Sequence, residues 1–378
     1  MQELLHGTLL RLLGIPELRH DLAPENRGEL QVGSVVVEKW LFTAEPGSRI
    51  PANLYRPQTV TEPVPAMVLT CGHGDSKGLA HMSYVAQTYA RAGLACLMAD
   101  PLGEEERSPD GSIGTREHDN PEVACRAEQL GRSVMGKLVF DAMRGIDFLH
   151  TLNWIDTDRI GVAGNSLGGA VASWLFALEP RLRATIVSGW SFTDELCRRS
   201  KHCTAVPIHK MRAVCEWPEL LRLAAVHNAL LVMNGDADVV IDKQQTGAPW
   251  RDLKAYLLSD VNSEQRRARC WFCHGGGHRP YQGTKQALRF IHEQLGTPRM
   301  SREQIDALPE LNYGAWCDGY GVEIEPLYGT GLHYRGATLP DLGLRPIARG
   351  DLAVLDSKEL GGTDFTIDGW LNGLGEER

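Results

Sequence analysis

Ser166 has the surroundings of a nucleophile that is held on a sharp turn. It lies in Gly164-Asn165-Ser166-Leu167-Gly168, where glycines flank the serine at two residues on either side. The pattern G-x-S-x-G is typical of a strained turn between a strand and a helix. A side chain at either glycine would collide with the strand or the helix. The spacing therefore predicts a serine hydroxyl at a helix N-terminus, where it can attack an electrophile.

A serine that attacks a carbonyl group also needs donors for the oxygen that becomes negatively charged. The backbone N–H of Leu167 is one candidate, because the positive end of the following helix dipole lies there. The second donor is expected in the loop after the apolar run 66–71. Glycines in Gly72-His73-Gly74 let the backbone approach closely. We assign the second donor to the N–H of His73, with Gly74 as the alternative register.

The acid of such a site is expected after a strand that follows the serine in the chain. An acid fixes the tautomer of the base and stabilises its charge. The apolar run 229–234 is followed by Gly235-Asp236-Ala237-Asp238. Asp236 falls in the tight turn directly after the run, where a turn role is expected. We favour Asp238, which precedes two valines that can anchor the loop, over Asp236.

The base is expected after the last strand, and two histidines compete for this role. His274 directly follows the apolar run 269–273 and would only complete the strand. His278 follows three consecutive glycines, which allow the loop to swing the imidazole back over the sheet toward Ser166. We therefore assign the base to His278.

A zinc site is the rival chemistry for the segment with Cys270, Cys273, His274 and His278. Side chains alternate along a strand, so the two cysteines would face opposite ways, and no second C-x-x-C pair completes a ligand set. No phosphate-binding G-x-x-x-x-G-K-[ST] occurs, and Gly329-Thr-Gly331 is too short for a dinucleotide site. We expect neither a metal nor a cofactor.

The elements that must position these residues alternate between apolar runs of strand length and amphipathic runs of helix length. This alternation predicts an α/β fold, a doubly wound and mostly parallel sheet with helices on both faces. An antiparallel hairpin is expected over residues 31–57, where two β-branched and aromatic runs flank a Pro-Gly turn. Ligand sites of such sheets lie at the carboxyl ends of the strands, where the polar loops above are expected. The strand runs are 66–71, 94–99, the run from Arg159, 184–188, 229–234 and 269–273, and the helix runs are 82–92, 134–149 and 285–295.

The chain is expected to divide into a catalytic domain, residues 1–296, and a C-terminal appendage of short strands and turns, residues 297–378. A short helix is expected at residues 301–308, and beyond it glycines, prolines and aromatics recur without long periodicity. Residues 189–228 are expected to be an irregular insertion, and the polar loop 104–114 to rim the site. The appendage could cap the site, mediate oligomerisation or only lengthen the fold.

Composition limits the partners of the protein. The 378 residues carry a net charge of −9, which argues against nucleic acid or an anionic membrane as the main partner. No run approaches the roughly 20 apolar residues that cross a bilayer. The leucine-rich N-terminus carries charges that favour a short amphipathic helix. The nine scattered cysteines fit a reducing cytoplasm better than a disulfide framework. We expect a cytoplasmic protein, compatible with a homo-oligomer.

Beyond these separate motifs, five segments between residues 35 and 295 carry a family resemblance. They are Cys71-Gly-His-Gly, Arg91-Ala-Gly-Leu-Ala-Cys-Leu-Met-Ala-Asp-Pro-Leu-Gly-Glu, Asp156-Thr-Asp-Arg-Ile-Gly-Val-Ala-Gly-Asn-Ser-Leu-Gly-Gly, Asn234-Gly-Asp-Ala-Asp and Gly277-His. Together they resemble the α/β-hydrolase superfamily, most closely its acetyl xylan esterase-like and dienelactone hydrolase-like branch.

The resemblance implies a catalytic role for each matching position. Ser166 would be the nucleophile, Asp238 the acid and His278 the base, with the N–H groups of Leu167 and His73 as the oxyanion hole. One departure is Cys71, where relatives commonly have histidine. Because the donor in that loop is a backbone group, this change affects packing more than chemistry. The C-terminal appendage is not part of the usual pattern.

The expected activity is hydrolysis of a carboxylic ester, a small acyl group on a polar or carbohydrate-like alcohol, through an acyl-enzyme. The partner would thus be a small-molecule ester. The same three residues could instead cleave an amide, a thioester or a carbon–carbon bond. From a different class, the chain could be a catalytically silent scaffold that binds a ligand or a partner.

Overall fold

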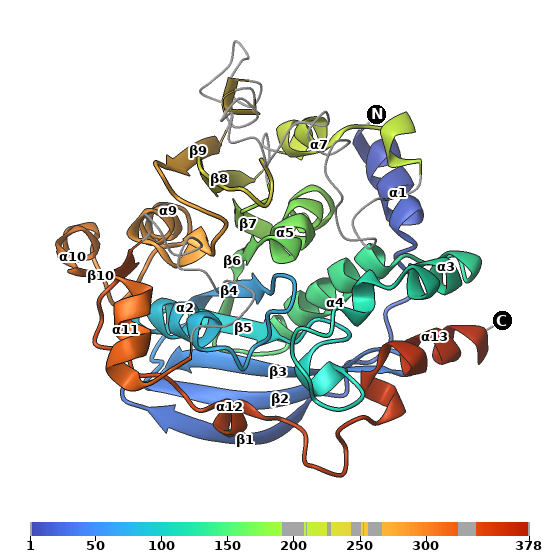
Figure 1. The fold of residues 1–378 in the computed structure, drawn as a ribbon, viewed down its shortest axis with the longest axis horizontal. Helices are drawn as coiled ribbons and strands as arrows, with labels where there is room; N and C mark the ends of the chain where they lie inside the picture. The colour runs from blue at the N-terminus through green and yellow to red at the C-terminus, as the bar shows by residue number, and fades with distance from the viewer. Residues whose placement is uncertain are drawn as a thin grey trace.

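The fold is built on one central sheet with helices on both faces (Figure 1). The computed structural model describes residues 2–190, 208, 210–224, 228–242, 251, 253–255, 267–323 and 338–376. In spatial order the nine strands are β1 (Glu25–Val32), β2 (Val35–Glu45), β3 (Ser48–Pro57), β5 (Ala95–Ala99), β4 (Val64–Thr70), β6 (Ile155–Asn165), β7 (Leu182–Ser188), β8 (Ala229–Gly235) and β9 (Ala268–Cys273). All neighbours from β5 to β9 are parallel, which confirms the predicted doubly wound, mostly parallel sheet.

The N-terminal part of the sheet is antiparallel. β2 and β3 form the predicted hairpin, which turns at Pro46 and Gly47, and β3 pairs antiparallel with β5. β1 adds an edge strand that the sequence analysis did not predict. Its first five residues, 25–29, are polar or glycine and exposed, so they lack the alternation of apolar side chains that marks a half-buried strand.

Two hydrophobic cores cover the two faces of the sheet. One contains apolar side chains of α1 (Gln2–Leu13), α4 (Val134–Leu149), α5 (Leu167–Leu178) and α7 (Trp217–Ala224). The other contains those of α2 (Ala80–Arg91) and α9 (Lys285–Leu295). The near-continuous apolar runs of the parallel strands follow from this arrangement, because both faces of each strand are covered. A further helix, α3 (Pro121–Gln129), lies beside α4 (Figure 1).

The sequence also sets where several of these helices begin. The side chain of Ser133 accepts a hydrogen bond from the N–H of Gly136 at the start of α4. Thr284 does the same for Ala287 at the start of α9. Such caps satisfy backbone donors that have no partner inside the helix. None of the helices in the described part of the chain combines the length and apolar character needed to cross a membrane.

The segment after residue 296 runs from the α2 side of the sheet to the α4 side (Figure 1). A short helix is present where the sequence indicated one, at residues 301–308. Elsewhere the sequence predicted short strands and turns, whereas the described part holds mainly short helices. Its elements are α10 (Arg302–Ala307), β10 (Glu310–Leu311), α11 (Tyr313–Tyr320), β11 (Leu339–Pro340), α12 (Arg349–Leu352) and α13 (Ile367–Glu376).

The described parts of this segment, residues 297–323 and 338–376, contact the sheet domain at several places. The Tyr84 hydroxyl of α2 donates to the carbonyl oxygen of Pro340 over 2.8 Å, and the Asn53 side chain of β3 donates to that of Leu352 over 3.0 Å. The indole of Trp370, in α13, is completely buried in the core on the α4 side. The two hydrogen bonds link residues more than 250 positions apart, which no local sequence pattern reports.

Candidate active site

Ser166 occupies a strained turn between β6 and α5. Its φ is 57° and its ψ −119°, a backbone conformation that residues other than glycine rarely adopt. A Cβ atom at Gly164 would lie 2.3 Å from the carbonyl oxygen of Gly168, and one at Gly168 equally close to that of Thr70. The glycine spacing read from the sequence is thus the steric condition for this turn.

The turn is fixed to the neighbouring strand and to the loop after β9. The N–H of Ser166 donates to the carbonyl oxygen of Ser188, the last residue of β7, over 3.0 Å. The Ser188 hydroxyl lies within hydrogen-bond distance of Asn165 Oδ1 and of the Arg279 carbonyl oxygen, and accepts from the Tyr281 N–H. Ser188 therefore joins the serine turn to the segment that carries the predicted base.

The predicted acid and base are paired inside the protein. His278 Nδ1 lies 2.7 Å from Asp238 Oδ2, and both side chains are buried. The other oxygen of Asp238 accepts the N–H groups of Val240 and Ile241, which fixes the carboxylate. The imidazole lies beside the serine turn, because a Cβ at Gly189 would be 3.1 Å from His278 Cε1 and 2.6 Å from Asn165 Oδ1.

The competing residues Asp236 and His274 form a separate pair on the surface. His274 Nδ1 lies 2.9 Å from Asp236 Oδ2, and the His274 side chain is fully exposed. The other Asp236 oxygen accepts the N–H of Gly275. The preferred residues Asp238 and His278 are thus the buried pair. Asp236 instead binds the loop after β9, and its contact to Gly275 is not the local turn contact expected from the sequence.

The surroundings of His278 favour its protonated form. Burial lowers the pKa of the imidazole, but the charge of Asp238, its hydrogen bond and the charge of Asp75 act in the opposite direction. The net effect raises the pKa of His278 above its ordinary value. A histidine that takes a proton from a hydroxyl group must hold it while the bond forms, and the Asp238 carboxylate stabilises that imidazolium.

The second predicted donor lies in the loop between β4 and α2, residues 72–79, which we call the oxyanion loop. Here Asp75 Oδ2 accepts the N–H of Gly72 over 3.1 Å, and a Cβ at Gly72 would lie 3.1 Å from the Asn165 carbonyl oxygen. The loop thus packs against the residue before Ser166. The N–H of His73 has no acceptor among the described residues. Leu167 is the first residue of α5, and the N–H groups of a helix's first turn have no partner within the helix.

A second loop brings His118 against the oxyanion loop. The rings of His73 and His118 have centroids 5.0 Å apart, and His118 is completely buried. Burial lowers the pKa of His73 to about 3 and that of His118 to about 4, so both rings are neutral near pH 7. The sequence analysis gave no role to His118 or to the buried Asp75; the only signal for Asp75 was an acid directly after Gly-His-Gly in a loop between apolar runs.

Two other expectations concern loops and metals. The loop expected to rim the site is packed inward at its start, where Glu104, Glu105, Glu106 and Arg107 are all buried. Within the described ranges, no three histidine, cysteine or carboxylate side chains are placed to hold a metal ion. Of the expected insertion 189–228, residues 191–207, 209 and 225–227 lie outside the described residues, as does Gly329-Thr-Gly331.

Comparison with known proteins finds similarity to families of hydrolases. Residues 18–198 match the family model described as acetyl xylan esterase, and residues 128–296 match that of the prolyl oligopeptidase family. A curated protein from Bacillus subtilis that is named as a hydrolase, YtaP, is 23% identical over 205 residues. That match covers 51% of this chain and 63% of the relative, so it spans less than two thirds of the relative's length.

Solved structures share the fold at low sequence identity. A protein from Bacteroides fragilis described as an acetyl xylan esterase superposes with a TM-score of 0.57 at 18% identity, over 72% of this chain and 74% of that chain. A glucuronoyl esterase from Solibacter usitatus superposes with a TM-score of 0.53 at 15% identity, over 77% and 92%.

Proposed function

We propose that this chain, which belongs to the acetyl xylan esterase-like branch of the α/β-hydrolase superfamily, hydrolyses carboxylic esters with Ser166 as the nucleophile. The observation that carries the proposal is the buried Asp238–His278 pair beside the strained Ser166 turn. A buried ion pair and a strained residue both cost folding free energy, and such features cluster at functional sites.

The reaction would proceed by two acyl transfers. His278 accepts the Ser166 proton as the hydroxyl attacks the ester carbonyl, and Asp238 stabilises the resulting imidazolium. The N–H groups of Leu167 and His73 hold the negatively charged oxygen. The imidazolium then protonates the leaving alcohol, an acyl-enzyme remains on Ser166, and water activated by His278 releases the acid.

The proposed substrate is a small acyl group on a polar or carbohydrate-like alcohol. Support comes from the match of residues 18–198 to the acetyl xylan esterase family, whose name states an acetyl ester of a polysaccharide. The structural neighbours include enzymes named for two kinds of carbohydrate ester, the acetyl and the glucuronoyl ester. We propose the acetyl type, because the family match is to that type.

Labelling with a fluorophosphonate tests the nucleophile directly, because the reagent reacts only with an activated serine. We expect the wild type to be labelled and to hydrolyse p-nitrophenyl acetate, and Ser166→Ala to do neither. Ser301→Ala, which removes an exposed hydroxyl at the start of α10, is the matched control and should behave as the wild type. Equal labelling of wild type and Ser166→Ala, or labelling of neither, would contradict the proposal.

Cleavage of an amide bond is a second candidate, because residues 128–296 match the prolyl oligopeptidase family. The same nucleophile and base serve both reactions, so the leaving group decides between them. Side-by-side turnover of p-nitrophenyl acetate and peptide p-nitroanilides separates the two. Faster cleavage of an anilide, compared by kcat/KM, would favour the amide reading.

We also propose that the protein works in the cytoplasm with a small-molecule ester as its partner. All seven cysteines in the described part of the chain are free thiols, and five of them are buried. Such usage suits a reducing compartment. Fractionation of the source cells with a thiol-specific label would test this, and recovery of the active protein only from an oxidising compartment would contradict it.

A further inference from the structure

Two adjacent carboxylates, Glu105 and Glu106, each bind the oxyanion loop with one oxygen and the C-terminal segment with the other. We propose that residues 349–355 of the C-terminal segment position the oxyanion loop through these two side chains. Glu105, Glu106 and Arg349 would then be positioning residues for the reaction, although none of them touches the substrate. This inference rests on the proposed function, because it assigns the oxyanion loop a catalytic role.

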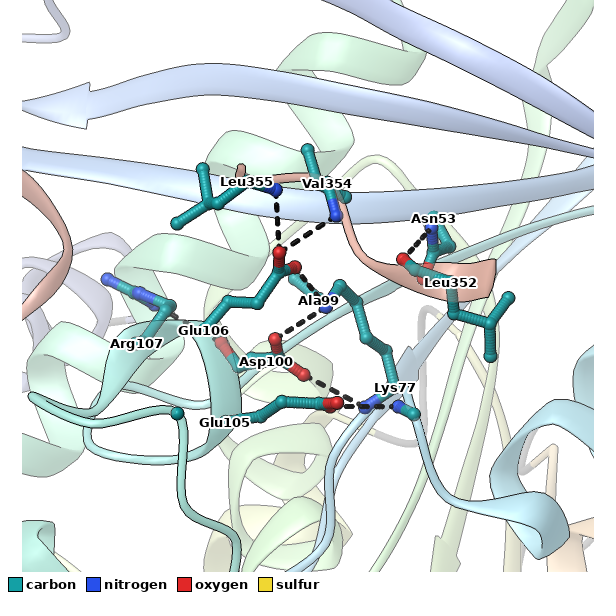
Figure 2. Close-up of polar contacts among 12 residues, drawn as sticks. Asn53, Lys77, Ala99, Asp100, Glu105, Glu106, Arg107, Leu352, Val354 and Leu355 are labelled. Carbon is teal, nitrogen blue, oxygen red and sulfur yellow. Dashed lines mark hydrogen bonds and ion pairs between the residues drawn. The ribbon is translucent and has the colours of Figure 1, made fainter. Parts of the chain in front are cut away.

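Glu106 makes the deeper of the two bridges (Figure 2). Its Oε2 atom forms an ion pair with Lys77 Nζ, four residues after His73 in the oxyanion loop. Its Oε1 atom accepts the backbone N–H groups of Val354 and Leu355, over 2.8 and 2.6 Å. A single carboxylate thus ties a loop near residue 77 to a segment more than 270 residues further along the chain.

Glu105 repeats this division one residue earlier. Its Oε2 atom accepts the N–H of Gly78 over 3.0 Å, and its Oε1 atom lies 2.7 Å from Arg349 Nε. A Cβ at Gly78 would lie 2.3 Å from Glu105 Oε1, so the glycine permits this close approach. Glu105 itself has a φ of 46°, an unfavourable backbone conformation for a side chain of its size. Strain of this kind persists only where surrounding contacts hold it.

Lys77 also anchors the loop through Asp100, the residue after β5 (Figure 2). Its ammonium group lies 2.7 Å from Asp100 Oδ2, and its backbone N–H donates to Asp100 Oδ1 over 2.9 Å. Lys77 and Asp100 are completely buried, and Glu106 is nearly so. Charged side chains in such a buried site keep a fixed geometry, because a buried ammonium or carboxylate group without its partner strongly destabilises the fold.

The network acts on the part of the loop that matters for catalysis. The N–H of His73 must point at the position of the developing oxyanion, and a displacement of about 1 Å can cost about 10²-fold in rate. The short loop between Gly72 and Leu79 is fixed at one end by Asp75 and at the other by Lys77 and Gly78. Loss of the second attachment therefore shifts the donor without removing it.

Arg349→Ala in the full chain tests the inference. The Arg349 side chain is about half exposed, and when it is removed the buried Glu105 carboxylate still accepts the N–H of Gly78. The control is Arg126→Ala. Arg126 also ties the C-terminal segment to the sheet domain, through Asp368 at 2.7 Å, and is equally exposed. Only the partner of Arg349 also binds the oxyanion loop.

We expect Arg349→Ala to lower kcat on p-nitrophenyl acetate about tenfold, with KM changed less than about twofold. Fluorophosphonate labelling of Ser166 should slow by a similar factor but reach the same end point, which counts intact sites. Arg126→Ala should keep the wild-type kcat. A kcat of Arg349→Ala within about twofold of the wild type, or an equal loss in Arg126→Ala, overturns the inference.

The double variant Lys77→Met/Glu106→Gln gives a second measurement. It removes one buried charge of each sign, and the glutamine keeps an oxygen that can accept from Val354 and Leu355. We expect its kcat to fall at least as far as that of Arg349→Ala, per labelled site. A folded double variant with wild-type kcat would also overturn the inference. Either failure differs from failure of the proposed function, in which Ser166 would not be labelled at all.

Discussion

Replacing Asp238 by asparagine changes one atom of the candidate site and leaves its scaffold in place. Asp238 Oδ1 accepts the N–H groups of Val240 and Ile241, and an asparagine oxygen can keep both bonds. The amide nitrogen would then replace Oδ2, the atom 2.7 Å from His278 Nδ1. Because an amide N–H₂ donates, it favours the tautomer with the proton on Nε2, which cannot accept the proton of Ser166.

The expected loss is large. A catalytic histidine held in the wrong tautomer lowers kcat about 10⁴-fold. Asp236→Asn is the matched control: the same substitution, two residues away, in an aspartate that pairs with the fully exposed His274. An exposed ion pair is worth little, so kcat/KM of Asp236→Asn should stay within about twofold of the wild type.

The assay is p-nitrophenyl acetate turnover per folded molecule, with thermal unfolding of both variants measured in parallel. The reasoning fails if Asp238→Asn keeps more than about a tenth of the wild-type kcat while folded. It fails equally if Asp236→Asn loses as much activity as Asp238→Asn, because the surface pair would then be the functional one.

Three further predictions concern pH, charge and packing. Because the pKa of His278 is raised and the base must be neutral, kcat/KM should fall on acidification with a midpoint above pH 6.5, the ordinary histidine value, and a midpoint below it would contradict this. Burial would raise the pKa of Glu45, but Lys137 and other partners lower it to about 2, so its stabilisation is complete above the unfolded pKa and declines as pH falls toward 2. Glu45→Gln should therefore lower the free energy of unfolding in urea by about 3 kcal/mol at pH 7 and by roughly half as much at pH 3, whereas a constant difference would refute the assignment. Gly145 lies in α4 at a cavity of about 60 Å³, and a methyl group there would lie 3.1 Å from Leu97 Cδ2, the end of a side chain that can shift into the cavity. Gly145→Ala should therefore raise the free energy of unfolding by about 1 kcal/mol. A decrease in the free energy of unfolding would show that Leu97 does not shift.

The sequence was sufficient for the sheet and for the residues that local geometry dictates. Apolar runs of strand length predicted the strands β4 to β9, which are covered by helices on both faces of the sheet. The two glycines around Ser166 predicted the turn. Each of these features follows from sterics or burial within a few residues. The exposed edge strand β1 escaped prediction because it buries too few side chains to leave a pattern.

The choice between equivalent candidates was decided by tertiary structure. Asp236 and Asp238 are separated by one residue, and each binds a histidine. Turn chemistry favoured Asp238 by a modest margin, but only burial distinguishes the two pairs, since it depends on the whole sheet. Whether Asp238 and His278 act in catalysis stays a prediction until variants are assayed.

What the sequence by itself determined is the set of apolar strands in the core, the strained serine turn and the positions after later strands where an acid and a base belong. Only the tertiary structure showed that Glu105 and Glu106 face inward and join the loop after β4 to a segment near the C-terminus. The physical reason is range. Sterics and hydrophobic periodicity act between neighbours in sequence, whereas a buried carboxylate takes its partners from whichever distant segments the fold brings to it.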